Sequence, residues 1–321
     1  MTINGEIFKN KKIIITGGSG SIGSEIVLQL LKCEASQIRI YSNDEHGQNL
    51  LINKIGKDDR LRFLIGDIRD KDRMDKAFED ADICFHAAAL KHVHLCEYNP
   101  FEAVKTNIIG TQNVIDLAIK HDLEKVIAIS TDKAAAPFSV LGTSKLMMEK
   151  LITAADYIRG KSKIRFAAVR FGNVLNSRGS VIPLWKRQIK KGGPITVTNS
   201  GMTRFFMETS KAVNLVLRTA ELMQGGETFV FKMDKLSILD LAKMIIKKYS
   251  PDKDIPIKIV GIRRGEKMYE KLATEEELEC ALETDDMFIL IPQIEVFNFA
   301  NRTNKYPYAR PTKIREYRSD K

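Results

Sequence analysis

The chain has 321 residues, of which 44% are hydrophobic and 29% charged, as in an ordinary globular protein with one large domain or one domain and a smaller lobe. No apolar run approaches the roughly 20 residues that span a bilayer, and the opening MTINGEIFKNKK lacks a signal peptide's apolar segment, so we expect a cytoplasmic protein without a membrane span. The net charge of +10 is spread along the chain without a recognition motif, so we expect no nucleic-acid partner.

Short apolar runs alternate with helical patterns through the first half of the chain. Continuous β-branched runs separated by helices predict a parallel sheet that is covered on both faces, although a β/α-barrel would show the same alternation. In chain order, we expect strands at 12–16, 37–42, 61–67, 81–89, 125–131 and 163–174, and helices at 21–33, 101–121 and 139–159.

This rhythm loosens after Gly172. Residues 208–224 and 236–249 have helical patterns, whereas 254–321 is irregular with short strands. We therefore predict a dinucleotide-binding domain of residues 1–174, to which 201–249 returns, and a smaller C-terminal substrate-binding lobe of residues 175–200 and 250–321.

The four cysteines are scattered and contain no CxxC pair. Cys84 lies in the apolar run ADICFHAAA, which favours a reduced thiol in the core. His92, His94 and Cys96 stand close together in HVHLC, but no second ligand cluster accompanies them, and we expect no metal site.

A glycine-rich loop joins the first strand to its helix. The stretch ITGGSGSIGSEI places Gly17 at a tight turn, Gly20 where backbone can approach a pyrophosphate, and Gly23 where the helix packs on the strand. This arrangement excludes the barrel and predicts an α/β Rossmann-like, doubly wound parallel sheet. We expect further cofactor contacts from the residues between these glycines, namely Ser19, Ser21 and Ile22.

The GxxGxxG spacing resembles that of extended short-chain dehydrogenases/reductases, and three further blocks agree with the resemblance. GDI ends the third strand, HAAA ends the fourth, and a lysine lies on the helix after the fifth. The resemblance implies cofactor contacts from Asn43, Asp67, Ile68, Ala87, Ala89, Lys91 and Lys145.

The choice of nicotinamide cofactor depends on the end of the second strand, YSNDEHGQ. Ser42 leaves room for the 2′-phosphate of NADP, but no arginine follows it. Asp44 would serve NAD if the loop turned inward. We expect NADP, with NAD as the alternative.

Five longer blocks narrow the resemblance to the nucleotide-sugar 4,6-dehydratases, and within them to the group that acts on UDP-N-acetylglucosamine in capsule and flagellin-sugar pathways. They extend from about residue 11 to 272 and read HAAALKHVHLCEYNPFEAVKTNIIGTQNVI, STDKAA, RFGNVLNSRGSVIPLW, MTRFFM and GIRRGEKMYE. The resemblance implies a lyase that converts this UDP-sugar to a 4-keto-6-deoxy product. A UDP-N-acetylhexosamine 4-epimerase and a catalytically silent dinucleotide-binding protein are the alternatives.

By this resemblance, Asp132 is the acid at sugar carbon 6 and Lys133 the base at carbon 5, with Thr131 and Lys145 completing the catalytic set. We expect burial to raise the pKa of Asp132 and to lower that of Lys133. The implied substrate contacts are Lys91, His92, Asn173, Arg204, Arg263 and Glu266. Arg264 stands where relatives usually have a proline.

The tyrosine that usually precedes the lysine by four positions is replaced by Leu141. Leu141 and Lys145 share one helix face, so the leucine should face the site. Some relatives carry a methionine there and remain active, and our hypothesis is that a water held by Thr131 and Asp132 or Lys133 carries the proton instead. Family members commonly pair through the helices corresponding to 101–121 and 139–159, which implies a homo-oligomer.

Overall fold

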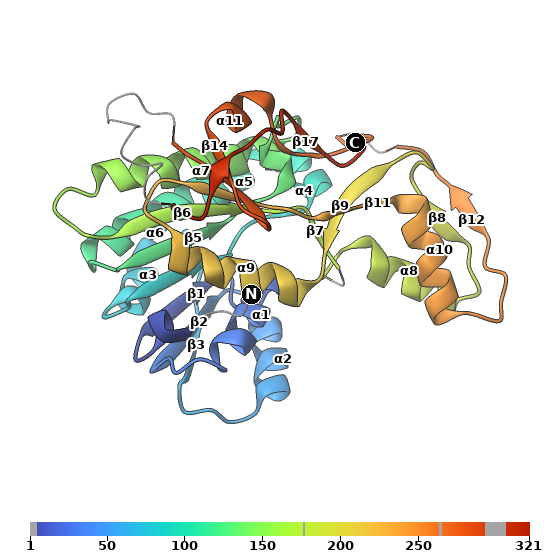
Figure 1. The fold of residues 1–321 in the computed structure, drawn as a ribbon. Helices are drawn as coiled ribbons and strands as arrows, with labels where there is room; N and C mark the ends of the chain where they lie inside the picture. The colour runs from blue at the N-terminus through green and yellow to red at the C-terminus, as the bar shows by residue number, and fades with distance from the viewer. Residues whose placement is uncertain (1–4, 176, 263–264, 293–305) are drawn as a thin grey trace.

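A ten-stranded sheet forms the centre of the protein (Figure 1). The computed structural model describes residues 5–175, 177–262, 265–292 and 306–321. From one edge, the strand order is β3 (Leu61–Ile65), β2 (Gln37–Ser42), β1 (Lys12–Thr16), β4 (Ile83–His86), β5 (Lys125–Ile129), β6 (Arg165–Arg170), β10 (Thr228–Phe231), β15 (Met287–Leu290), β14 (Ala281–Glu283) and β16 (Arg310–Pro311).

The seven strands from β3 to β10 are parallel, and β15, β14 and β16 continue the sheet antiparallel. The order reverses at β1, where β2 lies on one side and β4 on the other. This is the doubly wound arrangement that the sequence predicts, and the prediction is confirmed. In such sheets ligands bind beyond the carboxyl ends of the strands, at the point of reversal.

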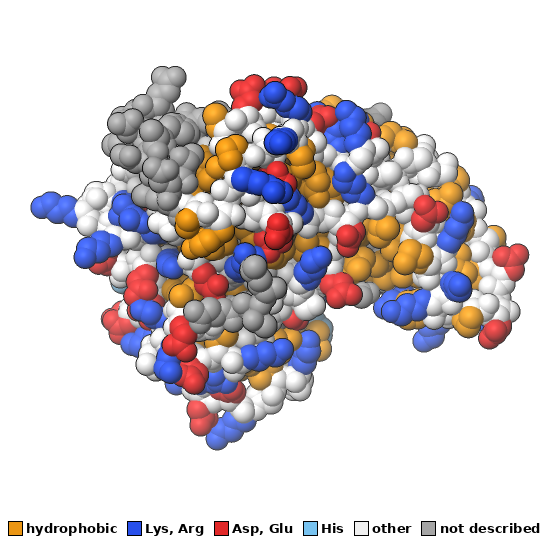
Figure 2. All heavy atoms as spheres, viewed as in Figure 1, with side chains coloured by type: hydrophobic (Ala, Val, Ile, Leu, Met, Phe, Trp, Pro, Cys, Tyr) orange, Lys and Arg blue, Asp and Glu red, His pale blue; other side chains and the backbone are white. Residues whose placement is uncertain are grey.

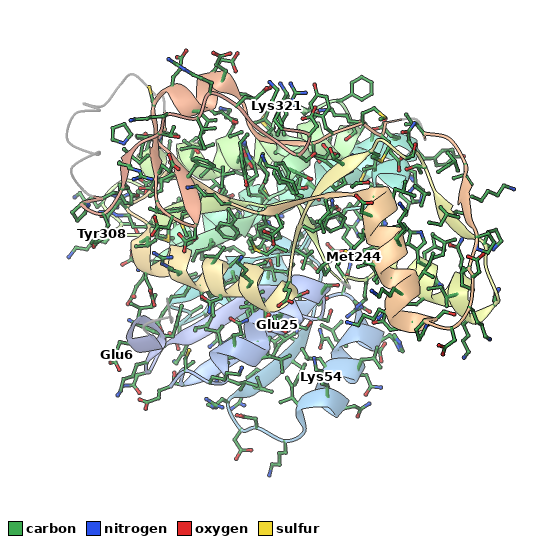
Figure 3. All side chains as sticks on the ribbon, turned by 45° about the vertical axis from the view of Figure 1, so that its right-hand side comes forward. Glu6, Glu25, Lys54, Met244, Tyr308 and Lys321 are labelled. Carbon is green, nitrogen blue, oxygen red and sulfur yellow. The ribbon has the colours of Figure 1, made fainter. Side chains whose placement is uncertain are left out.

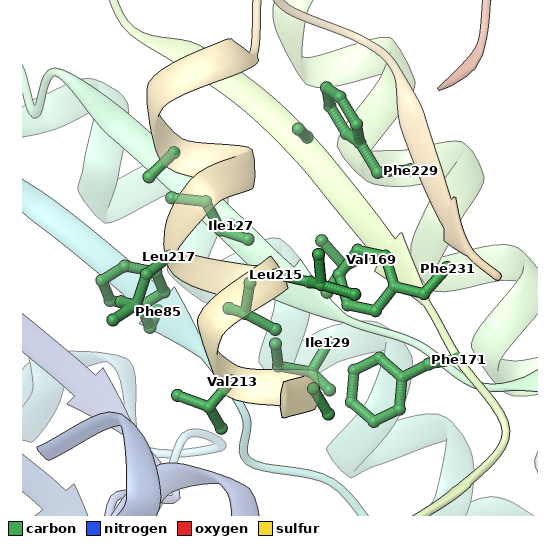
Figure 4. Close-up of a cluster of buried hydrophobic side chains, with 14 of the residues drawn as sticks. Phe85, Ile127, Ile129, Val169, Phe171, Val213, Leu215, Leu217, Phe229 and Phe231 are labelled. Atoms are coloured by element: carbon green, nitrogen blue, oxygen red, sulfur yellow. The ribbon is translucent and has the colours of Figure 1, made fainter. Parts of the chain in front are cut away.

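Helices cover both faces of the sheet. One face carries α1 (Ser21–Leu30), α2 (Glu45–Ile55) and α9 (Thr209–Leu222), and the other carries α3 (Lys71–Phe78), α6 (Gly110–Lys120) and α7 (Val140–Ile158). Alternate residues of β1 separate the two cores, because Ile13 and Ile15 pack under α1 whereas Ile14 packs on the opposite side. In Figure 4, Val213, Leu215 and Leu217 of α9 pack over the apolar side chains of β4, β5, β6 and β10.

The helix predicted over 101–121 is interrupted. The structure has α4 (Val93–Tyr98), α5 (Pro100–Ala103), a π-helical turn η2 (Val104–Ile109), and then α6. A π-turn widens the backbone locally and is frequent near functional sites. Here it turns Asn107 inward, where that residue is 1% exposed.

A smaller group of elements projects from the main body, at the right of Figure 1. It contains α8 (Val181–Lys190), α10 (Ile238–Tyr249), and the parallel pair β8 (Ile195–Val197) and β12 (Ile257–Ile259). Trp185, Ile195 and Leu241 belong to its own buried cluster, while Met244 of α10 is exposed and labelled in Figure 3. A three-stranded sheet of β7 (Asn173–Val174), β9 (Thr203–Met207) and β11 (Asp234–Ser237) leads into it.

The boundaries of the predicted lobes differ from this arrangement in two places. Residues 281–290 join the main sheet, because β15 is apolar and buried along its whole length and pairs with β10. Helix α10 leaves the main body instead of returning to it, because its apolar face packs with α8 around Trp185.

The remaining elements are short. They are η1 (Gly5–Phe8), η3 (Asp132–Ala134), α11 (Glu275–Glu279) and the antiparallel pair β13 (Lys271–Ala273) and β17 (Tyr317–Arg318). Within the described ranges, no helix is both long and apolar enough to cross a bilayer. In the same ranges, no three histidine, cysteine or acidic side chains gather as a metal site would require.

Cys84 is a fully buried free thiol, as predicted. The charged side chains on the face shown in Figure 2 are of both signs and are interspersed over the surface.

Candidate active site

A groove of about 1010 Å³ runs along the carboxyl ends of the parallel strands. It lies at the reversal point, and most of the residues predicted for the site line it. They are Gly17, Ser19, Gly20, Ser21, Ile22, Gly23, Asn43, Asp67, Ile68, Ala87, Ala89, Lys91, His92, Thr131, Lys133, Lys145 and Asn173.

The glycine loop fits a dinucleotide pyrophosphate. Gly17 has φ +67°, and a Cβ there would lie 2.7 Å from the backbone of Ala88. A Cβ on Gly23 would lie 2.3 Å from the carbonyl oxygen of Gly17, so only glycine lets α1 start this close to β1. A Cβ on Gly20 would meet only the Gly17 carbonyl, at 3.1 Å, which leaves its groove side open for a phosphate.

Two predicted cofactor contacts, Asn43 and Asp67, are hydrogen-bonded to each other at the β2 side of the groove. Asn43 Nδ2 donates to Asp67 Oδ2 at 3.0 Å, and Arg69 donates to both oxygens of Asp67. Hydrogen bonds from Arg69 hold the pKa of Asp67 below its usual value, although partial burial opposes them. The carboxylate is thus ionised and fixed as an acceptor that faces the groove.

Lys145 lies beneath the middle of the groove, on α7. Its Nζ donates to the carbonyl oxygen of Ile129 at 2.7 Å, and the residue is 6% exposed. Burial lowers the pKa of Lys145 to about 8, and the charge of Glu149 opposes only part of this effect. Near neutral pH the charged ammonium is present, and its burial destabilises the folded state. Deprotonation at higher pH removes this destabilisation.

Lys145 should make folding stability depend on alkaline pH. The unfolded chain holds this proton up to a pKa of 10.5 and the folded chain releases it near 8, so the unfolded state binds more protons between these values and stability rises with pH there. Between about pH 7.5 and about pH 9.5, the wild type should gain about 2 kcal/mol more than Lys145→Met. Urea titrations of both proteins at the two pH values measure it, and parallel changes would contradict it.

Asp132 and Lys133 follow β5 directly; Lys133 lines the groove, whereas Asp132 lies behind its surface and is not one of the described residues that line it. Asp132 is 1% exposed, and its Oδ1 accepts from Thr131 Oγ1 at 2.8 Å and from Lys133 Nζ at 3.0 Å. Its other oxygen, Oδ2, is buried without a hydrogen-bond partner among the described residues. A buried carboxyl oxygen without a partner is costly, so it is available for a group that enters the site.

Glu270, which the sequence analysis did not single out, completes this cluster. It is 4% exposed, and its Oε1 lies 3.5 Å from Lys133 Nζ and 3.9 Å from Arg204 Nε. A local signal was present, because Glu270 shares the inward face of an extended segment with the buried Leu272. Burial raises the pKa of Glu270, while the positive charge of Lys133 opposes that effect.

The predicted lowering of the Lys133 pKa is wrong for this arrangement. Burial does favour the neutral amine, but the negative charges of Asp132 and Glu270 outweigh it and raise the pKa of Lys133 above its ordinary value. The prediction rested on burial, and the charge of the second carboxylate, Glu270, acts against it.

Arg204 requires a second correction. The resemblance implies a substrate contact, but Arg204 does not line the groove, and its Nη1 donates to the carbonyl oxygens of Thr203 and Met268 and its Nη2 to that of Lys267. It is 8% exposed and braces the segment that carries Glu270. Two further predicted substrate contacts are not confirmed in the groove. Glu266 is not among the described residues that line it, and Arg263 lies outside the described residues.

Leu141 faces the groove beside Lys145, as their spacing predicts. Its side chain packs with Cys96 and Ala103, so the position is a dry wall.

Asn107 lies nearby and was not predicted as a site residue, although it belongs to the first of the five sequence blocks that carry the resemblance. Its Oδ1 accepts from Leu90 N at 2.8 Å and its Nδ2 donates to Ser144 Oγ at 3.0 Å, which ties the end of β4 to α7.

Residues 13–292 match the sequence profile of the family described as polysaccharide biosynthesis protein. The chain belongs to this family. A protein of Methanocaldococcus jannaschii, named only as an uncharacterized membrane protein, is 51% identical over 290 residues, which are 89% of this chain and 87% of that protein.

Proteins with named activities are also similar to this chain. A UDP-N-acetylglucosamine 4,6-dehydratase (inverting) of Campylobacter jejuni is 39% identical over 94% of this chain and 87% of its own length. A UDP-glucose 4-epimerase of Rickettsia canadensis is 40% identical over 88% of this chain and 83% of its own. The crystal structure of Pen from Bacillus thuringiensis superposes with a TM-score of 0.89 at 44% identity, covering 98% of this chain and 93% of that one.

Proposed function

We propose that the protein is a nucleotide-sugar 4,6-dehydratase of surface-glycan biosynthesis, a lyase that converts UDP-N-acetylglucosamine to a UDP-2-acetamido-4-keto-2,6-dideoxyhexose. The observation that carries the proposal is the Asp132–Lys133 pair at the end of β5, with one carboxyl oxygen buried and unpartnered among the described residues. The similar dehydratase from Campylobacter jejuni supports this choice of substrate and reaction.

The groove residues fit a nicotinamide dinucleotide, with the glycine loop at its pyrophosphate and Lys145 at the ribose next to the nicotinamide. When bound, this cofactor takes a hydride from sugar carbon 4 and later returns it at carbon 6. Lys145 is held for this task by the Ile129 carbonyl, and its partial desolvation strengthens the hydrogen bonds it donates. The remaining chemistry belongs to the residues after β5.

The Asp132–Lys133 pair holds the one proton that the elimination needs. In the resting pair this proton is on Lys133, 3.0 Å from Asp132 Oδ1. A sugar that fills the groove excludes water, and a drier environment favours the neutral pair, so the proton moves to Asp132. Lys133 then removes the carbon-5 proton, and Asp132 protonates the hydroxyl that leaves carbon 6 as water. The products of these two steps are an ammonium and a carboxylate, which is the resting pair again.

Glu270 and Arg204 support this cycle from the other wall. Arg204 fixes the backbone at 267–268, and its charge offsets that of Glu270. Glu270 then holds Lys133 from the side opposite Asp132. The base is thereby kept in one orientation, which positions it over a single ring carbon.

Leu141 makes a 4-epimerase the weaker alternative, even though one similar protein is named as such. We retain the hypothesis that a water held by Thr131 and the pair removes the carbon-4 hydroxyl proton. Ser130 Oγ, buried without a partner in the described chain, offers a further anchor for that water. Leu141→Tyr should therefore change dehydratase turnover by less than about tenfold. A newly added acid–base group would raise the rate by about 100-fold or more only if no other group already performed that proton transfer. Steady-state assays measure it, and a much larger gain would indicate a damaged site.

We also propose a homo-oligomer. Helices α4, α5 and α7 and the turn η2 are neighbours and expose large apolar side chains, namely Leu95, Tyr98, Phe101, Ile109 and Met147. A monomer rarely exposes such a group of side chains together. Sedimentation velocity should give a mass above the 36.3 kDa of one chain.

The cytoplasmic location stays a prediction.

Mass spectrometry of the reaction with UDP-N-acetylglucosamine tests the proposed activity. A dehydratase product is lighter than the substrate by one water, whereas a 4-epimer has the same mass. Loss of water supports the proposal, and conversion without a change in mass would replace it with the epimerase.

A further inference from the structure

Arg178 comes from a distant part of the chain and contacts two residues that line one end of the groove, Ser19 and Asp44. It follows β7, and its backbone N donates to Ser21 Oγ at 2.9 Å. Its guanidinium donates from Nη1 to Asp44 Oδ2 at 2.8 Å and from Nη2 to the carbonyl oxygen of Ser19. One side chain thus contacts both the glycine loop and the segment that follows β2. The sequence of that segment, YSNDEHGQ, contains no arginine of its own.

The neighbours of Arg178 fix this position. Lys91 Nζ, on the opposite side of the groove, donates to the carbonyl oxygen of Arg178 at 2.7 Å. Gly179 has φ +75°, and a Cβ on it would lie 2.5 Å from the ring of His92. The segment therefore crosses from the glycine loop to the region after β4, and only a glycine permits this close passage.

The Arg178–Asp44 pair adds little to folding stability. Both side chains are substantially exposed, at 50% and 40%, and exposed pairs are typically worth less than about 1 kcal/mol. Asp44 also caps α2, since its Oδ1 accepts from Gly47 N at 2.8 Å. Both carboxylate oxygens are thus engaged, which leaves Asp44 poorly placed to bind a ribose 2′-hydroxyl as the carboxylate of an NAD-selective enzyme does.

The groove beside this pair is suited to a phosphate. Ser42 ends β2 with a small side chain, and Ser19, whose carbonyl oxygen accepts from Arg178, donates from its Oγ to Ser42 Oγ at 2.8 Å. Pairing with Arg178 compensates the charge of Asp44, which would otherwise repel an anion. A guanidinium carries five N–H groups in a fixed fork that matches phosphate oxygens, and its bonds to Asp44 and Ser19 use two of its nitrogens.

We propose that Arg178 binds the 2′-phosphate of NADP and is the residue that makes the protein prefer NADP to NAD. The inference rests on the proposed nicotinamide site and adds the residue that selects the cofactor. An arginine near the end of the second strand accommodates this phosphate in related folds. Here it is supplied by the segment after β7, which packs across the groove.

Calorimetric titration of the apo protein with NADP and with NAD tests the inference without any turnover. Arg178→Gln should weaken NADP binding by about 10- to 100-fold, the effect of losing a charge-assisted hydrogen bond, and NAD binding by less than about threefold. Arg178→Lys keeps the charge but loses the fork, so it should fall between the two. Arg187→Gln, on the exposed side of α8, is the control with the same charge change and should alter neither affinity.

The possible results separate this inference from the proposed function. Equal weakening of both cofactors, or tighter binding of NAD than NADP by the wild type, would overturn the role of Arg178 while leaving a nicotinamide site intact. Unchanged NADP binding by Arg178→Gln would likewise overturn the role of Arg178 and leave the nicotinamide site intact. If the wild type bound neither cofactor, both the inference and the proposed function would fail. Matching circular dichroism spectra of all variants would exclude misfolding as the cause.

Discussion

Lys133→Met should lower dehydratase turnover by about 100- to 10,000-fold, the range for loss of a positioned acid or base. Methionine keeps the length of the side chain but cannot accept the carbon-5 proton. Thr131 and Asp132 remain to hold the water that serves the first hydride step, so reduced nicotinamide should accumulate with bound substrate in this variant. Its absorbance after rapid mixing measures that accumulation.

Asp132→Asn provides the matched comparison. It removes the acid at carbon 6 and also the group that takes the Lys133 proton, so the amine must lose that proton to solvent. Carbon-5 hydrogen should then exchange slowly with solvent deuterium while water is not lost. Lys133→Met should show no such exchange. If both variants exchanged equally, or if Lys133→Met turned over at the wild-type rate, the assignment of acid and base would be wrong.

Arg170→Met should lower the free energy of unfolding by about 3–5 kcal/mol, because it leaves two carboxylates without their cation. Arg170 is 1% exposed and donates to Glu149 of α7 and to both carboxylate oxygens of Glu277 in α11. It also donates to the Leu272 carbonyl at 3.0 Å. These carboxylates raise the pKa of Arg170, although burial opposes them, and the group joins the helix of Lys145 to the segment of Glu270.

Two controls distinguish a buried network from a generic loss of charge. Lys71→Met breaks the exposed pair with Asp116 and should cost less than about 1 kcal/mol. Adding Glu149→Leu and Glu277→Leu to Arg170→Met should recover most of the loss, because the unpaired charges are removed as well. Denaturant titrations measure all three, and equal costs for Arg170→Met and Lys71→Met would contradict the argument.

The fold and the cofactor loop could be predicted from the sequence because their signals are local. The apolar run of β1 and the positions of Gly17, Gly20 and Gly23 determine a strand, a tight turn and a closely packed helix within a few residues of each other. The Asp132–Lys133 pair was predictable for a similar reason, since both residues follow one buried strand directly.

What the sequence analysis missed depends on contacts between distant segments. Arg178 meets Asp44, and Glu270 meets Lys133, only because the segments after β7 and before β13 pack across the groove. The inverted shift of the Lys133 pKa has the same origin, because one of the two carboxylates comes from far along the chain. The π-turn at Asn107 had no pattern of its own, since a π-turn and an α-helix present similar apolar spacing over so few residues.

Proton NMR of the wild type with UDP-N-acetylglucosamine and NADP in heavy water tests the central claim most directly. The account predicts a 4-keto-6-deoxy product that carries deuterium at carbon 5, because Lys133 removes that hydrogen and solvent replaces it. Accumulation of the 4-epimer alone, with hydrogen kept at carbon 5, would contradict the roles given to Asp132 and Lys133.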